Sequence, residues 1–145
     1  MNNEPPTERI FGLDYGSRRI GVAVSDSLGL TAQPLAPIIR SGDKKDIEEL
    51  GRRAADLEIT SIVLGLPLLM NGEEGPSAVR ARKFGAQIEE SLNLPVAMWD
   101  ERLTTVQAER HLVESNLSRE RRKELRDSLA AMFILQSALD LRNRK

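Results

Sequence analysis

The chain has 145 residues, of which 40% are hydrophobic and 30% charged, and its formal net charge is −1. This length and composition predict one soluble globular domain that is long enough to bury a hydrophobic core. The absence of cysteine excludes disulfides, thiol nucleophiles and cysteine-based zinc sites, and it fits a reducing compartment. A net charge near zero argues against binding nucleic acid through bulk positive charge, so any site for a polyanion must be local.

No segment has the basic and then apolar arrangement of a secretory signal, and no apolar run reaches the ~18 residues of a membrane span. We therefore expect a cytoplasmic protein that does not contact membranes. Residues 1–8 are expected to form a short disordered leader, and residues 9–145 a single domain.

The first half of the chain predicts three strands and a helix. Residues 10–13 and 20–24 have the composition of buried strands, and the Gly16-Ser-Arg-Arg segment between them suits a tight antiparallel connection. The two prolines within residues 34–40 favour an edge strand. Residues 43–57 form an amphipathic pattern, and Asp43 is placed to begin that helix as its N-cap.

The second half predicts two more strands, each followed by a helix. Residues 61–66 are continuously apolar, as in a strand covered on both faces, and Pro76 opens the next helix. Residues 95–99 form the fifth strand. A capping box at Thr104 and Gln107 begins a third helix, and residues 118–141 are again helical. This order predicts an α/β fold with a mixed five-stranded sheet and helices on both faces.

Two predicted strands end in acidic residues. Asp14 closes the first strand, and Asp100 and Glu101 follow the fifth. Because ligands of open α/β sheets collect at the carboxyl ends of strands, parallel strands would bring Asp14 and Glu101 to one rim. Simpler interpretations remain: Asp14 can order the turn that follows it, and Asp100 with Glu101 can favour a helix N-terminus.

A third acid, Asp127, lies near the start of the last predicted helix. Helical spacing places it on a face of small apolar residues, so its side chain is expected to point toward protein. That face comprises Ala130, Ala131, Ile134 and Ala138. The alternative is that Asp127 only caps a helix that begins at Ser128.

Three carboxylates from separate elements would repel one another, and the sequence places no lysine or arginine that must neutralise each of them. A divalent cation would remove this repulsion, and oxygen ligands suit Mg²⁺ or Mn²⁺. The single histidine, His111, lies in a polar helical segment, which disfavours zinc and a Ser-His-Asp triad. We therefore predict that Asp14, Glu101 and Asp127 hold such an ion.

With these acids placed, the chain resembles the YqgF family, also called RuvX, of RNase H-like nucleases from about residue 9 to 141. The resemblance rests on the motifs LDYGSRRIGVAVSD, GLPLLMNG, RARKFG, DERLTT and RDSLAAMFILQ. It implies an RNase H-like fold and an endonuclease that matures the 16S ribosomal RNA precursor in the cytoplasm, with ribosomal particles as partners. The acidic site of the family maps onto Asp14, Glu101 and Asp127, so the resemblance implies that these are the catalytic residues and that they hold one or two ions.

The family is also related to Holliday junction resolvases, so the resemblance allows branched DNA as a second substrate. One departure lies in the loop after the fourth strand, where Leu69 and Asn71 stand in place of the family's Asn and frequent Asp.

A site of this kind predicts a mechanism without a protein nucleophile. Two divalent ions about 4 Å apart can activate water on one side of a phosphodiester and stabilise the leaving oxygen on the other. Local basic side chains are then predicted to bind the nucleic acid, although each could equally belong to a solvated surface. They are Arg18, Arg19, Arg80, Arg82, Lys83 and Arg102. A monomer or weak dimer is expected.

Two other function classes compete with this interpretation. The Asp-x-Gly segment after the first strand also resembles the phosphate loop of actin-like and sugar kinases, but those proteins clamp nucleotide between two such domains. A non-catalytic RNA-binding module for ribosome assembly would keep the fold without the activity. The retention of all three acids favours the nuclease.

Overall fold

The computed structural model describes residues 8–104, 118 and 126–144. These residues form strands and helices in the order β1 (Ile10–Tyr15), β2 (Arg19–Ser25), β3 (Ala32–Ile39), α1 (Asp43–Asp56), β4 (Ser61–Leu66), α2 (Pro76–Leu92), β5 (Val96–Asp100), the short 3₁₀ helix η1 (Glu101–Leu103) and α5 (Arg126–Arg142). The predicted third helix, His111 and residues 119–125 lie outside this part of the chain.

The strands form one mixed sheet in the order β3-β2-β1-β4-β5. β1 pairs with β2 and β2 with β3 in antiparallel fashion, whereas β1, β4 and β5 are parallel. The prediction of a mixed five-stranded sheet is confirmed. β3 occupies an edge, as expected for a strand whose prolines cannot donate hydrogen bonds to a second neighbour.

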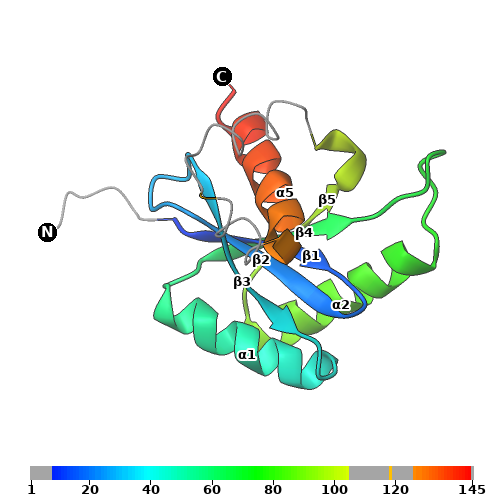
Figure 1. The fold of residues 1–145 in the computed structure, drawn as a ribbon, viewed down its shortest axis with the longest axis horizontal. Helices are drawn as coiled ribbons and strands as arrows, with labels where there is room; N and C mark the ends of the chain where they lie inside the picture. The colour runs from blue at the N-terminus through cyan, green and yellow to red at the C-terminus, as the bar shows by residue number, and fades with distance from the viewer. Residues whose placement is uncertain (1–7, 105–117, 119–125, 145) are drawn as a thin grey trace, which may run out of the picture.

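Helices cover both faces of the sheet, as predicted (Figure 1). α1 and α2 lie on one face, where Phe11 and Leu13 of β1 pack against Phe84 and Ile88 of α2 in the larger core. α5 lies on the opposite face, where Ile10 contacts a second apolar cluster. Because successive side chains of a strand point to opposite faces, β1 supplies both cores.

Glycines let α5 lie directly on the central strands. A Cβ atom on Gly12 would lie 2.6 Å from Leu135 Cβ, and one on Gly21 would lie 2.3 Å from the Asp127 carbonyl oxygen. Only residues without a side chain permit this approach. The first turn of α5 is therefore fixed above the β1–β2 hairpin, beside the carboxyl end of β1.

The predicted N-cap of α1 is wrong. The N-cap is Gly42 and not Asp43, whose carboxylate instead accepts hydrogen bonds from Tyr15 and Arg40 at 2.6 Å each. Glu8, the last residue of the expected leader, donates its backbone N–H to the Ser27 carbonyl. Within the described residues, no helix is both long and apolar enough to cross a membrane.

Candidate active site

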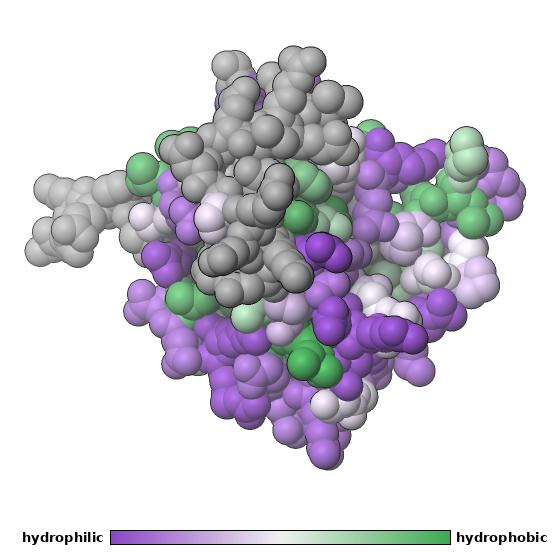
Figure 2. Space-filling model, in the orientation of Figure 1, coloured by the Kyte–Doolittle hydropathy of each residue, from purple (hydrophilic) through white to green (hydrophobic). Residues whose placement is uncertain are grey.

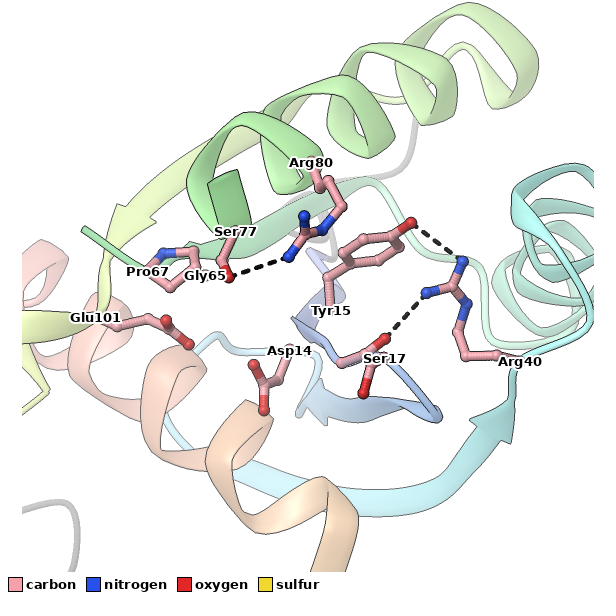
Figure 3. A pocket seen from close by; sticks show the side chains of 10 residues that line it. Asp14, Tyr15, Ser17, Arg40, Gly65, Pro67, Ser77, Arg80 and Glu101 are labelled. Carbon is pink, nitrogen blue, oxygen red and sulfur yellow. Dashed lines mark hydrogen bonds between the residues drawn. The ribbon is translucent and has the colours of Figure 1, made fainter. Parts of the chain in front are cut away.

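The carboxyl ends of β1 and β5 bring Asp14 and Glu101 together. Asp14 is the fifth residue of β1, and Glu101 follows directly after β5, with the parallel strand β4 between them. The sequence predicted this meeting on the condition that the strands run parallel, and the sheet meets that condition. Their side chains point into one pocket (Figure 3).

The two carboxyl groups interact directly, and each has an unusual proton affinity. Burial raises the pKa of Asp14, and a hydrogen bond with Glu101 offsets part of that rise. Burial first, and then the charge and hydrogen bond of Asp14, raise the pKa of Glu101 to about 7. Each carboxyl group therefore holds its proton more tightly than an isolated acid does, as expected for two partly buried acids in contact.

Gly65, the penultimate residue of β4, leaves space for the Glu101 carboxylate. A Cβ atom at this position would lie 2.9 Å from Glu101 Oε1 and 2.7 Å from Ile134 Cδ1. The strand between the two acids thus has to carry glycine where it passes beneath them. The motif SIVLGL predicts the strand, but it gives no sign that its glycine belongs to the site.

The pocket has a volume of about 640 Å³ and carries both acidic and basic or hydroxyl groups on its walls. Opposite the carboxylates, α2 contributes Ser77 and Arg80, whose Nη2 donates to Ser77 Oγ at 3.3 Å (Figure 3). Ser17, from the turn after β1, lines the same space. Among the described residues Arg80 forms no ion pair, so its charge is available to an anion in the pocket.

A buried ionic cluster holds the turn that follows Asp14. Arg40 donates to the Gly16 carbonyl at 2.9 Å, to Tyr15 Oη at 3.1 Å and to Asp46 Oδ2 at 2.7 Å. Asp46 is only 1% exposed. The Tyr15 ring lies 4.3 Å from that of Phe84, and burial followed by the Asp43 hydrogen bond raises the Tyr15 pKa. Arg40 thus connects the end of β3, α1 and the β1–β2 turn, and it lines the pocket together with Tyr15.

Asp127 lies at a second pocket, on the other side of Asp14. This pocket, of about 500 Å³, is lined by Asp14, Arg18, Arg19 and Asp127 among others. Asp127 is not free: Arg19 Nη1 contacts its Oδ2 at 2.6 Å. The expectation that no basic residue neutralises the acids is therefore wrong for Asp127, because β2 runs directly beneath the first turn of α5 and presents Arg19 there.

The inner stripe of α5 also differs from the prediction. Ser128, and not Asp127, heads the face that packs on the sheet, and its hydroxyl accepts the Val22 backbone N–H at 3.1 Å. Ala131 and Leu135 continue this face, whereas Ala130 is exposed. Relative to the prediction, the helix is rotated by one residue. The backbone of α5 at Asp127 lies directly against Gly21, which leaves no room there for the Asp127 side chain.

The predicted basic residues fall into two groups. Arg18, Arg19 and Arg80 line the two pockets. The others do not line them: Arg82 binds Glu74 at 2.7 Å, Arg102 binds Asp100 at 2.8 Å, and Lys83 is exposed on α2. Arg102 lowers the pKa of Asp100 by hydrogen bonding, so it is the partner of Asp100 and not of Glu101.

The structure provides a donor set of two carboxylates for a cation. Among residues 8–104, 118 and 126–144, no three acidic or histidine side chains are close enough together to hold a metal ion. Asp14 and Glu101 are nevertheless suitable ligands for Mg²⁺ or Mn²⁺, since these ions bind through one or two carboxylates together with substrate phosphate and water.

Comparisons with known proteins agree with the geometry. The family model described as "RuvX: Holliday junction resolvase" matches residues 8–141. The chain belongs to the RuvX family. A relative from Myxococcus xanthus, named "Putative pre-16S rRNA nuclease", is 52% identical over 132 residues, which are 91% of this chain and 87% of the relative. A relative from Clostridium beijerinckii with the same name is 50% identical over 94% of this chain and 99% of its own length.

Solved structures place this RuvX chain in the RNase H-like fold. Thermus thermophilus RuvC covers 92% of the chain and 95% of its own length at 15% identity, with a TM-score of 0.55. The fowlpox virus resolvase, solved with Holliday junction DNA, covers 94% and 99% at 14% identity, with a TM-score of 0.58. The family and fold expected from the sequence motifs are both confirmed.

Proposed function

We propose that this RuvX protein is a metal-dependent endonuclease that hydrolyses phosphodiester bonds in the precursor of 16S ribosomal RNA. The observation that carries the proposal is the contact between Asp14 and Glu101 in an open pocket with Arg80 on its opposite wall. Paired carboxylates, and a guanidinium that has no acidic partner among the described residues, suit a cation and a phosphate that bind side by side. The names of the two bacterial relatives support ribosomal RNA as the substrate.

Asp14 and Glu101 would hold Mg²⁺ or Mn²⁺, as one or two ions, and Asp127 would join them after it leaves Arg19. The cation, when bound, supplies an activated water and stabilises the charge on the leaving oxygen. Asp14 lies between the two pockets and is the acid placed to serve both. Because Glu101 must lose its proton before it can bind a cation, its raised pKa links activity to pH.

The basic and hydroxyl groups would position the RNA. Arg80 and Ser77 would hold the phosphate on the α2 side, and Arg18 and Arg19 would hold the strand on the α5 side. Lys83 lies farther out and would contact the backbone beyond the scissile bond, whereas Arg82 and Arg102 are held by Glu74 and Asp100. We further propose that the protein works in the cytoplasm on ribosomal particles, as a monomer or weak dimer.

A second candidate substrate is a four-way DNA junction, which the description of the matching family model favours. The two substrates place different demands on the protein, since a symmetric junction requires a dimer whereas an RNA end can be cut by a monomer. The pocket itself recognises only a phosphodiester, so the substrate must be distinguished by experiment.

The test incubates the purified full chain with Mg²⁺ and three labelled substrates: 16S precursor RNA, an unrelated single-stranded RNA and a four-way DNA junction. We expect cleavage of the precursor at a defined position, no cleavage in EDTA, and recovery with Mn²⁺. Preferred cleavage of the junction would replace the proposed substrate. Binding of the precursor without any cleavage would contradict the enzyme and favour an assembly module.

A further inference from the structure

The loop between β4 and α2, residues 67–75, projects from the body of the molecule (Figure 1). Its tip is apolar, with Met70 98% exposed and Leu69 48% exposed. Figure 2 shows hydrophobic surface gathered on this projection, in an otherwise largely hydrophilic face. Scattered exposed apolar residues are ordinary in proteins, so the position and order of the loop have to decide whether this tip has a role.

Backbone hydrogen bonds hold the tip in one shape. Leu69 N–H donates to the Glu73 carbonyl at 2.9 Å, and Gly72 N–H donates to the Leu69 carbonyl at 2.8 Å. Asn71 Oδ1 accepts the Glu73 N–H at 2.9 Å, and Gly72 adopts a φ of 88° that favours glycine. The Met70 side chain is therefore presented by an ordered turn and not by a loose segment.

The tip is also tied to the active site. Arg102 Nη1 donates to the Met70 carbonyl at 3.4 Å, and the same guanidinium binds Asp100 next to Glu101. The loop begins at Pro67, which lines the pocket, and it leads to α2, where Ser77 lines it. The loop therefore leaves from the rim of the pocket and returns to it, and its tip is held to the residue that follows Glu101.

The chemistry of the tip suits a base better than a phosphate. The loop contributes Glu73 and Glu74, and the guanidinium groups beside it are engaged by Glu74 and Asp100. Acidic groups repel a phosphate, whereas an exposed thioether can pack on the face of a ring. Aromatic residues are only 3% of the chain, and its tyrosine ring is stacked on Phe84. The chain therefore has few aromatic side chains with which to stack on a base, and an exposed thioether can take that role.

We propose that Met70, supported by Leu69, packs against one nucleobase of the RNA next to the scissile phosphodiester and fixes the position of the strand. Leu69 supports this contact from the protein side. Its side chain packs against the backbone at Gly75, where an added Cβ would lie 3.2 Å from Leu69 Cδ2. The inference rests on the proposed function and names a positioning and specificity contact of the same site.

The test combines Met70→Ala with a series of 16S precursor RNA substrates, each of which lacks a single base near the cleavage position. We measure kcat/KM with Mg²⁺ for the full chain. Met70→Ala is expected to lower kcat/KM about tenfold on intact RNA, a loss on the order of one stacked base. Met70→Leu should restore most of it. Leu28→Ala, which alters a 68% exposed residue in the turn after β2, serves as the control.

The decisive result is a coupling between Met70 and one base. For the wild-type protein, kcat/KM should be about tenfold lower on one of the abasic substrates than on intact RNA. For Met70→Ala, kcat/KM should be the same on that substrate and on intact RNA. Equal losses for both proteins at every position, or full activity of Met70→Ala on intact RNA, would overturn the inference and leave the nuclease proposal standing. Failure of the wild-type chain to cut any RNA would overturn both.

Discussion

Arg19 Nη1 contacts Asp127 Oδ2 at 2.6 Å, so the carboxylate that was predicted to bind a cation forms an ion pair with a basic residue of β2. The side chains are 52% and 38% exposed, and ion pairs with such exposure stabilise a fold by about 1 kcal/mol or less. The pair can therefore open at little cost. In the proposed site, Arg19 would be the counter-ion that a metal ion replaces.

Replacing Arg19 by alanine should release Asp127. We expect the free energy of unfolding to change by about 1 kcal/mol or less, and the Mg²⁺ concentration for half-maximal cleavage to fall severalfold at saturating RNA. Arg19→Lys keeps the charge and is the matched control. A Mg²⁺ requirement that stays the same in Arg19→Ala would show that Asp127 is not a cation ligand.

Gly65→Ala should separate activity from stability. The new methyl group would contact Glu101 Oε1 and Ile134 Cδ1, which are ends of flexible side chains that can move. The fold should persist, but a displaced Glu101 is expected to lower kcat about tenfold or more, since small misplacements of catalytic groups are costly. Gly51→Ala meets Leu92 Cδ2 at 2.8 Å, far from the site, and should leave kcat unchanged. Equal losses in both variants would contradict this role of Gly65.

The raised pKa of Glu101 predicts how stability depends on pH. Between its ordinary value of 4.5 and about 7, the folded state binds more protons than the unfolded state, so stability falls as pH rises. Allowing for solvent screening of this partly exposed group, the loss should be about 1–2 kcal/mol in urea unfolding without divalent cations. Glu101→Gln should flatten the profile and Mg²⁺ should oppose the loss. A wild-type profile as flat as that of Glu101→Gln would refute the assignment.

Arg40→Met should destabilise the protein because Asp46 would remain buried without its partner. Removing one member of a buried pair costs about 3–5 kcal/mol, which urea unfolding would detect. Arg52→Met breaks an exposed pair with Glu49 and should leave the urea midpoint nearly unchanged. Similar losses in the two variants would indicate that the Arg40 cluster does not hold the site in place.

The sequence predicts the sheet and the meeting of Asp14 with Glu101 well, because strand length, apolar runs and crossover rules determine both. The rotation of α5 could not be predicted from helical periodicity, because Asp127 and Ser128 are each followed by apolar residues at helical spacing, and either could begin the buried face. It depends on Gly21, whose missing side chain admits the backbone of α5 and turns Ser128 inward.

The ion pairs of the basic residues could not be predicted from the sequence either. Arg19 and Asp127 are far apart along the chain, and only the crossing of α5 over β2 brings them together. Arg40 appeared only as the last residue of a predicted edge strand, yet it contacts Gly16, Asp43 and Asp46. Long side chains reach partners that a local pattern cannot identify.

The most direct test of the account is the cleavage rate of Asp14→Asn on the 16S precursor RNA with saturating Mg²⁺. Asp14 borders both pockets, so its loss should lower the single-turnover rate by about 10³-fold or more while the folded structure is retained. Asp56→Asn, which alters an exposed acid at the end of α1, should cleave at the wild-type rate. An Asp14→Asn rate within a few fold of wild type would contradict the proposed active site.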